Sequence, residues 1–158
     1  MKHGVLALLT VLLGSCVTTP KGELEDLKPA IRALHQSFRW KDFRGAAEMM
    51  VEEQREAFVK ARTKDKDDED LFITNFELED AKIAPDMLSA KAFTRISWYR
   101  LPSATEKTAT VTSVFVWREG VWQLESQEDG PFDDLKPDPK KKKKPAPVQP
   151  QLAADAGE

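Results

Sequence analysis

The sequence has little of the residue types on which metal and covalent chemistry depend. It contains one cysteine (Cys16), two histidines (His3 and His35) and one tyrosine (Tyr99) among 158 residues. A single cysteine excludes an intramolecular disulfide and a cysteine-based metal cluster, and His35 alone cannot make a histidine site. A G-x-S-x-G turn and a glycine-rich phosphate loop are also missing. The sequence therefore predicts no cofactor, no metal site and no enzyme.

A long hydrophobic run is missing as well. The longest, Val5 to Leu13, is interrupted only by Thr10 and is about half of the ~20 residues that cross a bilayer as a helix. Lys2 precedes it and the small residues Gly14 and Ser15 follow it, which is the layout of a secretory signal. We therefore expect a signal peptide at residues 1–15 and a short tether at 16–22.

The end of this segment, Leu13-Gly14-Ser15-Cys16, resembles the lipobox of bacterial lipoproteins. The resemblance implies cleavage before Cys16 and acylation of its thiol, which would anchor the protein to a membrane. Val17, rather than aspartate, follows the cysteine. In the Gram-negative sorting pattern this favours the outer membrane, with the protein facing the periplasm. The alternative is an ordinary signal peptide in which the cysteine has no such role.

The C-terminal part changes in composition from Asp129. Prolines recur there and apolar residues are sparse, so we predict disorder over residues 129–158. A run of lysines occupies five consecutive positions: Lys140, Lys141, Lys142, Lys143 and Lys144. Two interpretations remain, a solvated linker and a contact with anionic envelope material. Nucleic acid is not an expected partner, because the net charge is only −3 and no aromatic residue lies among the lysines for base stacking.

Between these ends, residues 23–128 read as one domain. Apolar residues spaced three and four apart predict a first helix, and they are Leu24, Leu27, Ile31, Leu34 and Phe38. Pro29 lies within this stretch, so the helix either starts near Lys28 or is kinked at the proline. A second helix is expected after Asp42 and a third over 52–64. His35 is expected to be a partly buried helix residue. The acidic stretch 63–70 is expected to be a solvated loop, because it lacks the turn glycine of a calcium loop.

After residue 70 the apolar residues alternate with polar ones, a period of two, which predicts strands at 72–78, 89–99, 108–117 and 121–126. A two-residue turn at Glu119-Gly120 would pair Trp117 with Trp122 and Phe115 with Leu124. Helices followed by antiparallel strands predict an α+β fold, in which N-terminal helices pack on a curved, cone-like antiparallel sheet, followed by the disordered tail.

This domain resembles the nuclear transport factor two-like fold, also seen in ketosteroid isomerases. The resemblance rests on the opening helix, on the short second helix within residues 39–47, and on the late strand at 120–124. It implies a cone that holds a small ligand, carries out isomerase- or dehydratase-like chemistry, or serves only as a docking module. The fold alone does not choose among these functions.

The strand at 89–99 decides whether the cone holds a polar pocket. If Arg95, Ser97 and Tyr99 point inward, together with Phe93, they form a candidate anion-binding pocket. If the residues between them point inward, namely Ala92, Thr94, Ile96 and Trp98, the cone is a plain core. We favour the plain core, because burying Arg95 without a carboxylate partner is costly. The sequence thus favours a membrane-anchored, non-catalytic interaction or assembly domain, with a small-ligand-binding domain as the alternative.

Overall fold

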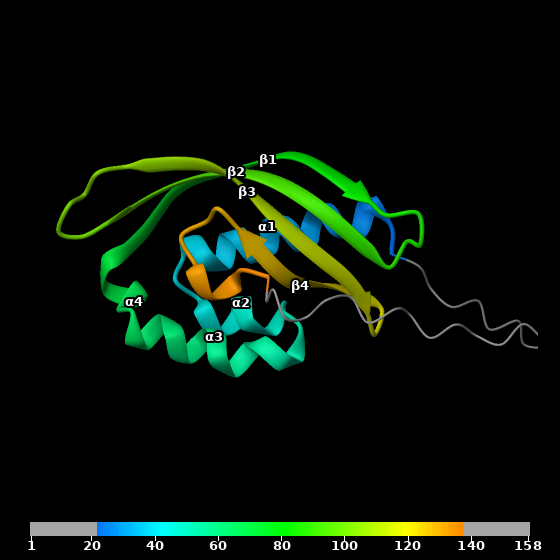
Figure 1. Cartoon of the computed structure of the whole chain (residues 1–158), viewed down its shortest axis with the longest axis horizontal. Coiled ribbons are helices and arrows are strands. Elements are labelled where there is room, and N and C mark those ends of the chain that lie inside the picture. Colours follow the sequence, from blue (N-terminus) through cyan, green and yellow to red (C-terminus); the bar gives the residue numbers. More distant parts are fainter. Residues whose placement is uncertain (1–21, 138–158) are drawn as a thin grey trace, which may run out of the picture.

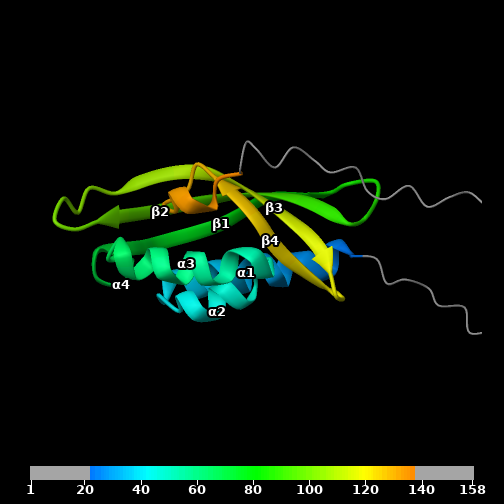
Figure 2. The same cartoon turned by 60° about the horizontal axis from the view of Figure 1, so that its bottom comes forward.

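A computed structural model describes residues 22–137. Helices come first and cover one face of an antiparallel sheet that curves over them (Figures 1 and 2), so the predicted α+β class is confirmed. The elements in chain order are α1 (Leu24–Arg39), α2 (Phe43–Glu48), α3 (Glu52–Lys64), α4 (Asp67–Asp70), β1 (Leu71–Ile83), β2 (Ser89–Arg100), β3 (Lys107–Arg118), β4 (Val121–Glu128) and the 3-10 turn η1 (Asp133–Leu135).

Helix α1 supplies one wall of the core through its apolar stripe. Leu27, Ile31, Leu34 and Phe38 are all buried, as their spacing predicts, whereas Leu24 at the first position is exposed. The helix begins at Leu24 and includes Pro29, so it does not start near Lys28. Its C-terminal turn leads to Asp42, whose side chain accepts a hydrogen bond from the backbone N–H of Gly45 at 2.9 Å. The expected cap of the second helix is therefore present.

The sheet is an antiparallel meander in the order β1-β2-β3-β4. The predicted register of the last hairpin is confirmed, since Trp117 pairs with Trp122 and Phe115 with Leu124. Glu119 and Gly120 form its turn with φ of 53° and 81°, as a tight turn with positive φ at both positions requires.

The free edge of β4 is covered by the connection between α2 and α3. The backbone N–H of Val51 donates to the Leu124 carbonyl at 3.0 Å, and the Leu124 N–H donates to the Met49 carbonyl at 2.9 Å. This cover protects a sheet edge that would otherwise expose unpaired backbone groups. Beneath this cover, Gln123 of β4 is only 7% exposed.

The prediction that the domain ends at 128 is wrong. Residues 129–137 continue along the domain, and both Phe132 and Leu135 are 2% exposed. The Phe132 ring lies 4.7 Å from that of Phe38 and 5.7 Å from that of Phe58, measured between centroids. Two apolar residues three apart are enough to dock a turn, although the surrounding composition is typical of disorder. The rest of the predicted tail, with its lysine run, lies outside the described residues, as do the predicted signal and the anchor at Cys16.

We predict that Phe132→Ala lowers the free energy of unfolding by about 3–5 kcal/mol, because it leaves a cavity between Phe38 and Phe58. Chemical denaturation followed by tryptophan fluorescence measures this loss. Phe93→Ala, at a partly exposed position of β2, is the control and should lose less. If Phe132→Ala lowered the free energy of unfolding no more than Phe93→Ala does, the packing of Phe132 in the core would be contradicted.

Candidate functional site

The inner face of β2 is a plain core, as favoured from the sequence. Ala92 and Thr94 are fully buried and Ile96 is 1% exposed, while Trp98 is half-buried and packs against the core. The concave side of the sheet is therefore filled by side chains that pack on the helices. The alternative in which Arg95, Ser97 and Tyr99 line the inside of the cone is wrong.

Those three residues lie on the outer face of the sheet and do not form a common pocket. Arg95 pairs with Glu79 and lies 3.9 Å from a Glu77 carboxylate oxygen. The Ser97 hydroxyl is 2.8 Å from that of Thr108, and the Tyr99 ring stacks on Phe72 at 5.0 Å. Arg95 thus has carboxylate partners in solvent, so the outward register avoids the cost of burying its charge.

His35 is more deeply buried than expected, at 1% exposure. Its Nδ1 donates to the Ile31 carbonyl at 2.8 Å, and its ring stacks on Phe76 at 5.6 Å. Burial lowers the pKa of His35 from 6.5 to about 4, although the bond to Ile31 acts to raise it. The imidazole is therefore neutral at physiological pH, and it serves as a packed core residue.

The pH dependence of folding follows from this pKa. Because the folded-state pKa of His35 is about 4 and the unfolded value is 6.5, the unfolded chain binds a proton in this range that the folded chain does not. The contribution of His35 to the free energy of unfolding is fully present above pH 6.5 and is lost as the pH falls toward 4.

We expect the wild type to lose roughly 2–3 kcal/mol more than His35→Gln between neutral pH and about pH 4.5. Urea denaturation at both pH values measures the difference, and the subtraction removes the contribution of the carboxylates that both chains share. A difference that does not change with pH would contradict the neutral, buried state of His35.

The acidic stretch 63–70 is not the solvated loop that we expected. Asp67 is fully buried, and its Oδ2 lies 2.9 Å from Nη1 of Arg62, itself 2% exposed. Asp67 also pairs with Arg100, and Arg62 pairs with Asp134. Burial raises the pKa of Asp67, while Arg100 and Arg62 act to lower it. The two carboxylates and the two guanidinium groups therefore neutralise one another's charge. Residues 22–137 contain no acidic or histidine cluster placed for a metal ion.

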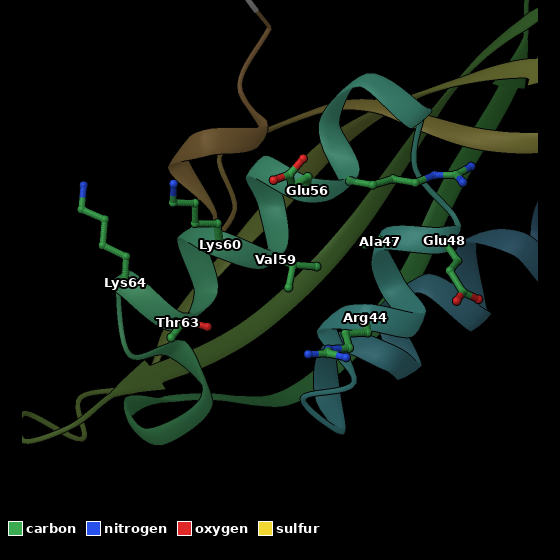
Figure 3. Close-up of a pocket in the computed structure, with 9 residues that line it drawn as sticks. Arg44, Ala47, Glu48, Glu56, Val59, Lys60, Thr63 and Lys64 are labelled. Carbon is green, nitrogen blue, oxygen red and sulfur yellow. The ribbon is translucent and has the colours of Figure 1, made fainter.

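A wide surface groove lies between α2 and α3, shown in Figure 3, with a volume of about 890 Å³. Its floor is apolar, with Ala47 from α2 and Val59 from α3. Its rim carries charged side chains from both helices, four basic and two acidic: Arg44, Arg55, Lys60, Lys64, Glu48 and Glu56. This arrangement suits an extended or helical segment with an apolar stripe and acidic flanks.

A second groove, of about 500 Å³, lies between α1 and the β3–β4 hairpin. Trp117 and Trp122 line it and meet edge to face, with ring centroids 5.3 Å apart. The Trp122 indole donates to the Glu23 carbonyl at 3.1 Å. These tryptophans therefore hold the start of α1 against the hairpin, close to the point where the described chain begins.

With this geometry, the domain has the fold of nuclear transport factor two-like and cystatin-like proteins. An NTF-2 like protein of unknown function from Shewanella oneidensis has a TM-score of 0.52 at 12% identity, and the match covers 65% of this chain and 94% of that one. A domain of unknown function with a cystatin-like fold from Nostoc punctiforme has a TM-score of 0.50 at 16% identity, covering 66% and 76%.

A SEC-C motif containing protein from Rhodopseudomonas palustris is similar to the same degree. Its TM-score is 0.52 at 16% identity, and the match covers 63% of this chain and 74% of that one. No protein-family model and no curated protein matches the chain. At such low identities the likeness shows the fold alone.

Proposed function

We propose that this protein is a lipid-anchored envelope protein whose folded domain is a non-catalytic interaction module. The observation that carries the proposal is the segment Leu13 to Cys16, where an apolar run ends in Gly-Ser-Cys with the chain's only cysteine. Acylation at Cys16 would supply two or more acyl chains, which hold a protein stably where a single chain does not. No helix within residues 22–137 is long and apolar enough to cross a membrane.

The proposal includes a location. Val17 rather than aspartate follows Cys16, which supports retention at the outer membrane with the domain in the periplasm. The lysine run 140–144 would add a contact with anionic envelope material through its charge. Both parts of the proposal rest on the resemblance to bacterial lipoproteins.

The interior supports a non-catalytic role. The concave side of the sheet is filled by packed side chains, and the buried charges Arg62 and Asp67 face each other. The polar residues of β2 that could have served a pocket, such as Arg95, lie on the outer face. An interaction module needs no such pocket, because its contacts are on the surface.

We assign the partner contact to the groove between α2 and α3. An apolar floor flanked by a net basic rim would bind an acidic segment of a partner protein that carries an apolar stripe. Val59 would supply most of the apolar contact, because Ala47 is only 4% exposed, and Lys60 and Lys64 would select for acidic residues.

The anchor is tested by Cys16→Ser. We expect the wild type to incorporate an alkyne-labelled palmitate and to remain with membranes after a high-salt wash, and we expect the variant to do neither. Clickable-lipid labelling and membrane fractionation measure both effects. Labelling that survives in Cys16→Ser would show that the chain is not anchored at this residue.

The groove is tested by a photo-crosslinking amino acid at position 59 in cells, with position 91 on the exposed outer face of β2 as the control. We expect a defined adduct from 59 and none from 91. Lys60→Glu combined with Lys64→Glu should reduce that adduct several-fold, because the basic rim becomes acidic. Equal adducts from both positions, or an adduct unaffected by the charge change, would argue against this groove.

A further inference from the structure

The exposed apolar side chains of the described domain gather at its two ends. Five large ones are exposed, and they are Leu24, Trp40, Leu88, Leu101 and Val121. Figure 1 shows the start of α1, the β1–β2 turn and the β3–β4 turn together at one end, with the β2–β3 loop at the other. Leu24, Leu88 and Val121 therefore share the first end, which we call the apolar tip.

Backbone contacts hold the parts of the tip together. The Gly22 N–H donates to the Met87 carbonyl at 3.3 Å, and the Trp117 N–H donates to the Leu88 carbonyl at 2.8 Å. Gly22 also packs on the rings of Trp117 and Trp122, where a Cβ would come within 2.3 Å of the Trp122 ring. The chain thus enters the domain in the middle of the apolar tip.

The anchor point is close to this entry. Cys16 precedes Gly22 by six residues, and a chain of that length spans at most ~20 Å when fully extended. Helix α1 has 16 residues and carries the chain ~24 Å away from the tip. Trp40 and Leu101 lie at the far end, so the short tether favours the tip over them as the surface nearest the lipid.

We infer that the apolar tip rests in the interface of the bilayer to which Cys16 is attached, with Leu24, Leu88 and Val121 in contact with lipid. This inference rests on the proposed acylation of Cys16. The partner is the lipid itself, because exposed aliphatic side chains gain free energy by leaving water. The anchored domain therefore stands with its long axis away from the membrane and its β2–β3 loop outermost.

The charges beside the tip identify the kind of lipid contact. The exposed neighbours Glu23, Asp86 and Glu119 are acidic, and Arg118 lies 3.2 Å from a carboxylate oxygen of Glu53. Anionic headgroups would not attract such a surface. The contact is apolar, so it forms on zwitterionic lipid and does not weaken at high salt.

The test uses single cysteines at Leu88→Cys and Val121→Cys, with Leu101→Cys at the far end as the matched control. Their native side chains are 48%, 53% and 44% exposed, so the three sites are equally accessible in the folded domain. An acylated Cys16 has no free thiol, so an environment-sensitive fluorophore labels only the engineered residue. The full acylated chain is reconstituted in phosphatidylcholine vesicles that carry a nitroxide-labelled lipid.

We expect fluorophores at 88 and 121 to emit at shorter wavelength, to brighten several-fold and to be quenched by the nitroxide, at low and high salt alike. The fluorophore at 101 should behave as it does in water. If the acylated protein floats with the vesicles in a density gradient while all three fluorophores report a water environment, the tip contact is overturned and the anchor stands. Equal quenching at all three sites would also overturn it. A chain that takes a second label at Cys16 and does not float would instead refute the anchor, and the tip contact with it.

Discussion

The ion pair between Arg62 and Asp67 is the constraint on which the rest of the domain depends. Both side chains are almost completely withdrawn from water. Removing one partner of such a pair costs about 3–5 kcal/mol, because the other is left charged and buried, whereas the intact pair adds little net stability. The pair therefore specifies how the neighbouring elements are arranged more than it stabilises the fold. It fixes the end of α3 against α4, and through Arg100 it fixes both to the end of β2.

The same guanidinium group also determines where the domain ends. The Arg62 guanidinium carbon lies over both the Phe58 and Phe132 rings, 4.4 and 4.5 Å from their centroids, and Arg62 pairs with Asp134. Residues 129–137 pack on the core after β4, and Phe132 is buried there against Phe38 and Phe58. The filled interior and the extended C-terminal boundary therefore have one cause.

Local patterns predicted much of this fold. The stripe of α1, the cap at Asp42, the turn at Glu119-Gly120 and the pairing of Trp117 with Trp122 all depend on residues close in sequence, and the structure confirms them. The prediction that Ala92, Thr94 and Ile96 point into the core followed from the cost of burying the charge of Arg95. Phe132 was misjudged because its partners Phe38 and Phe58 are far away in sequence. Asp67 was misjudged because its burial depends on tertiary packing that also brings the distant Arg100 to it. A charged or proline-rich composition says nothing of such partners.

The arrangement of surfaces would give a domain anchored at Cys16 a defined orientation on the membrane. Chain entry, both tryptophans of the hairpin and the apolar tip lie at one end, so a tether at Cys16 would bring that end to the lipid. Figures 1 and 2 show α2 and α3 on the helical side of the sheet, and the residues that line their groove do not include Leu24, Leu88 or Val121. A partner segment in the groove would therefore not compete with the bilayer for the same residues. Membrane contact and partner contact would use separate faces of one rigid core, and binding at one would leave the other open.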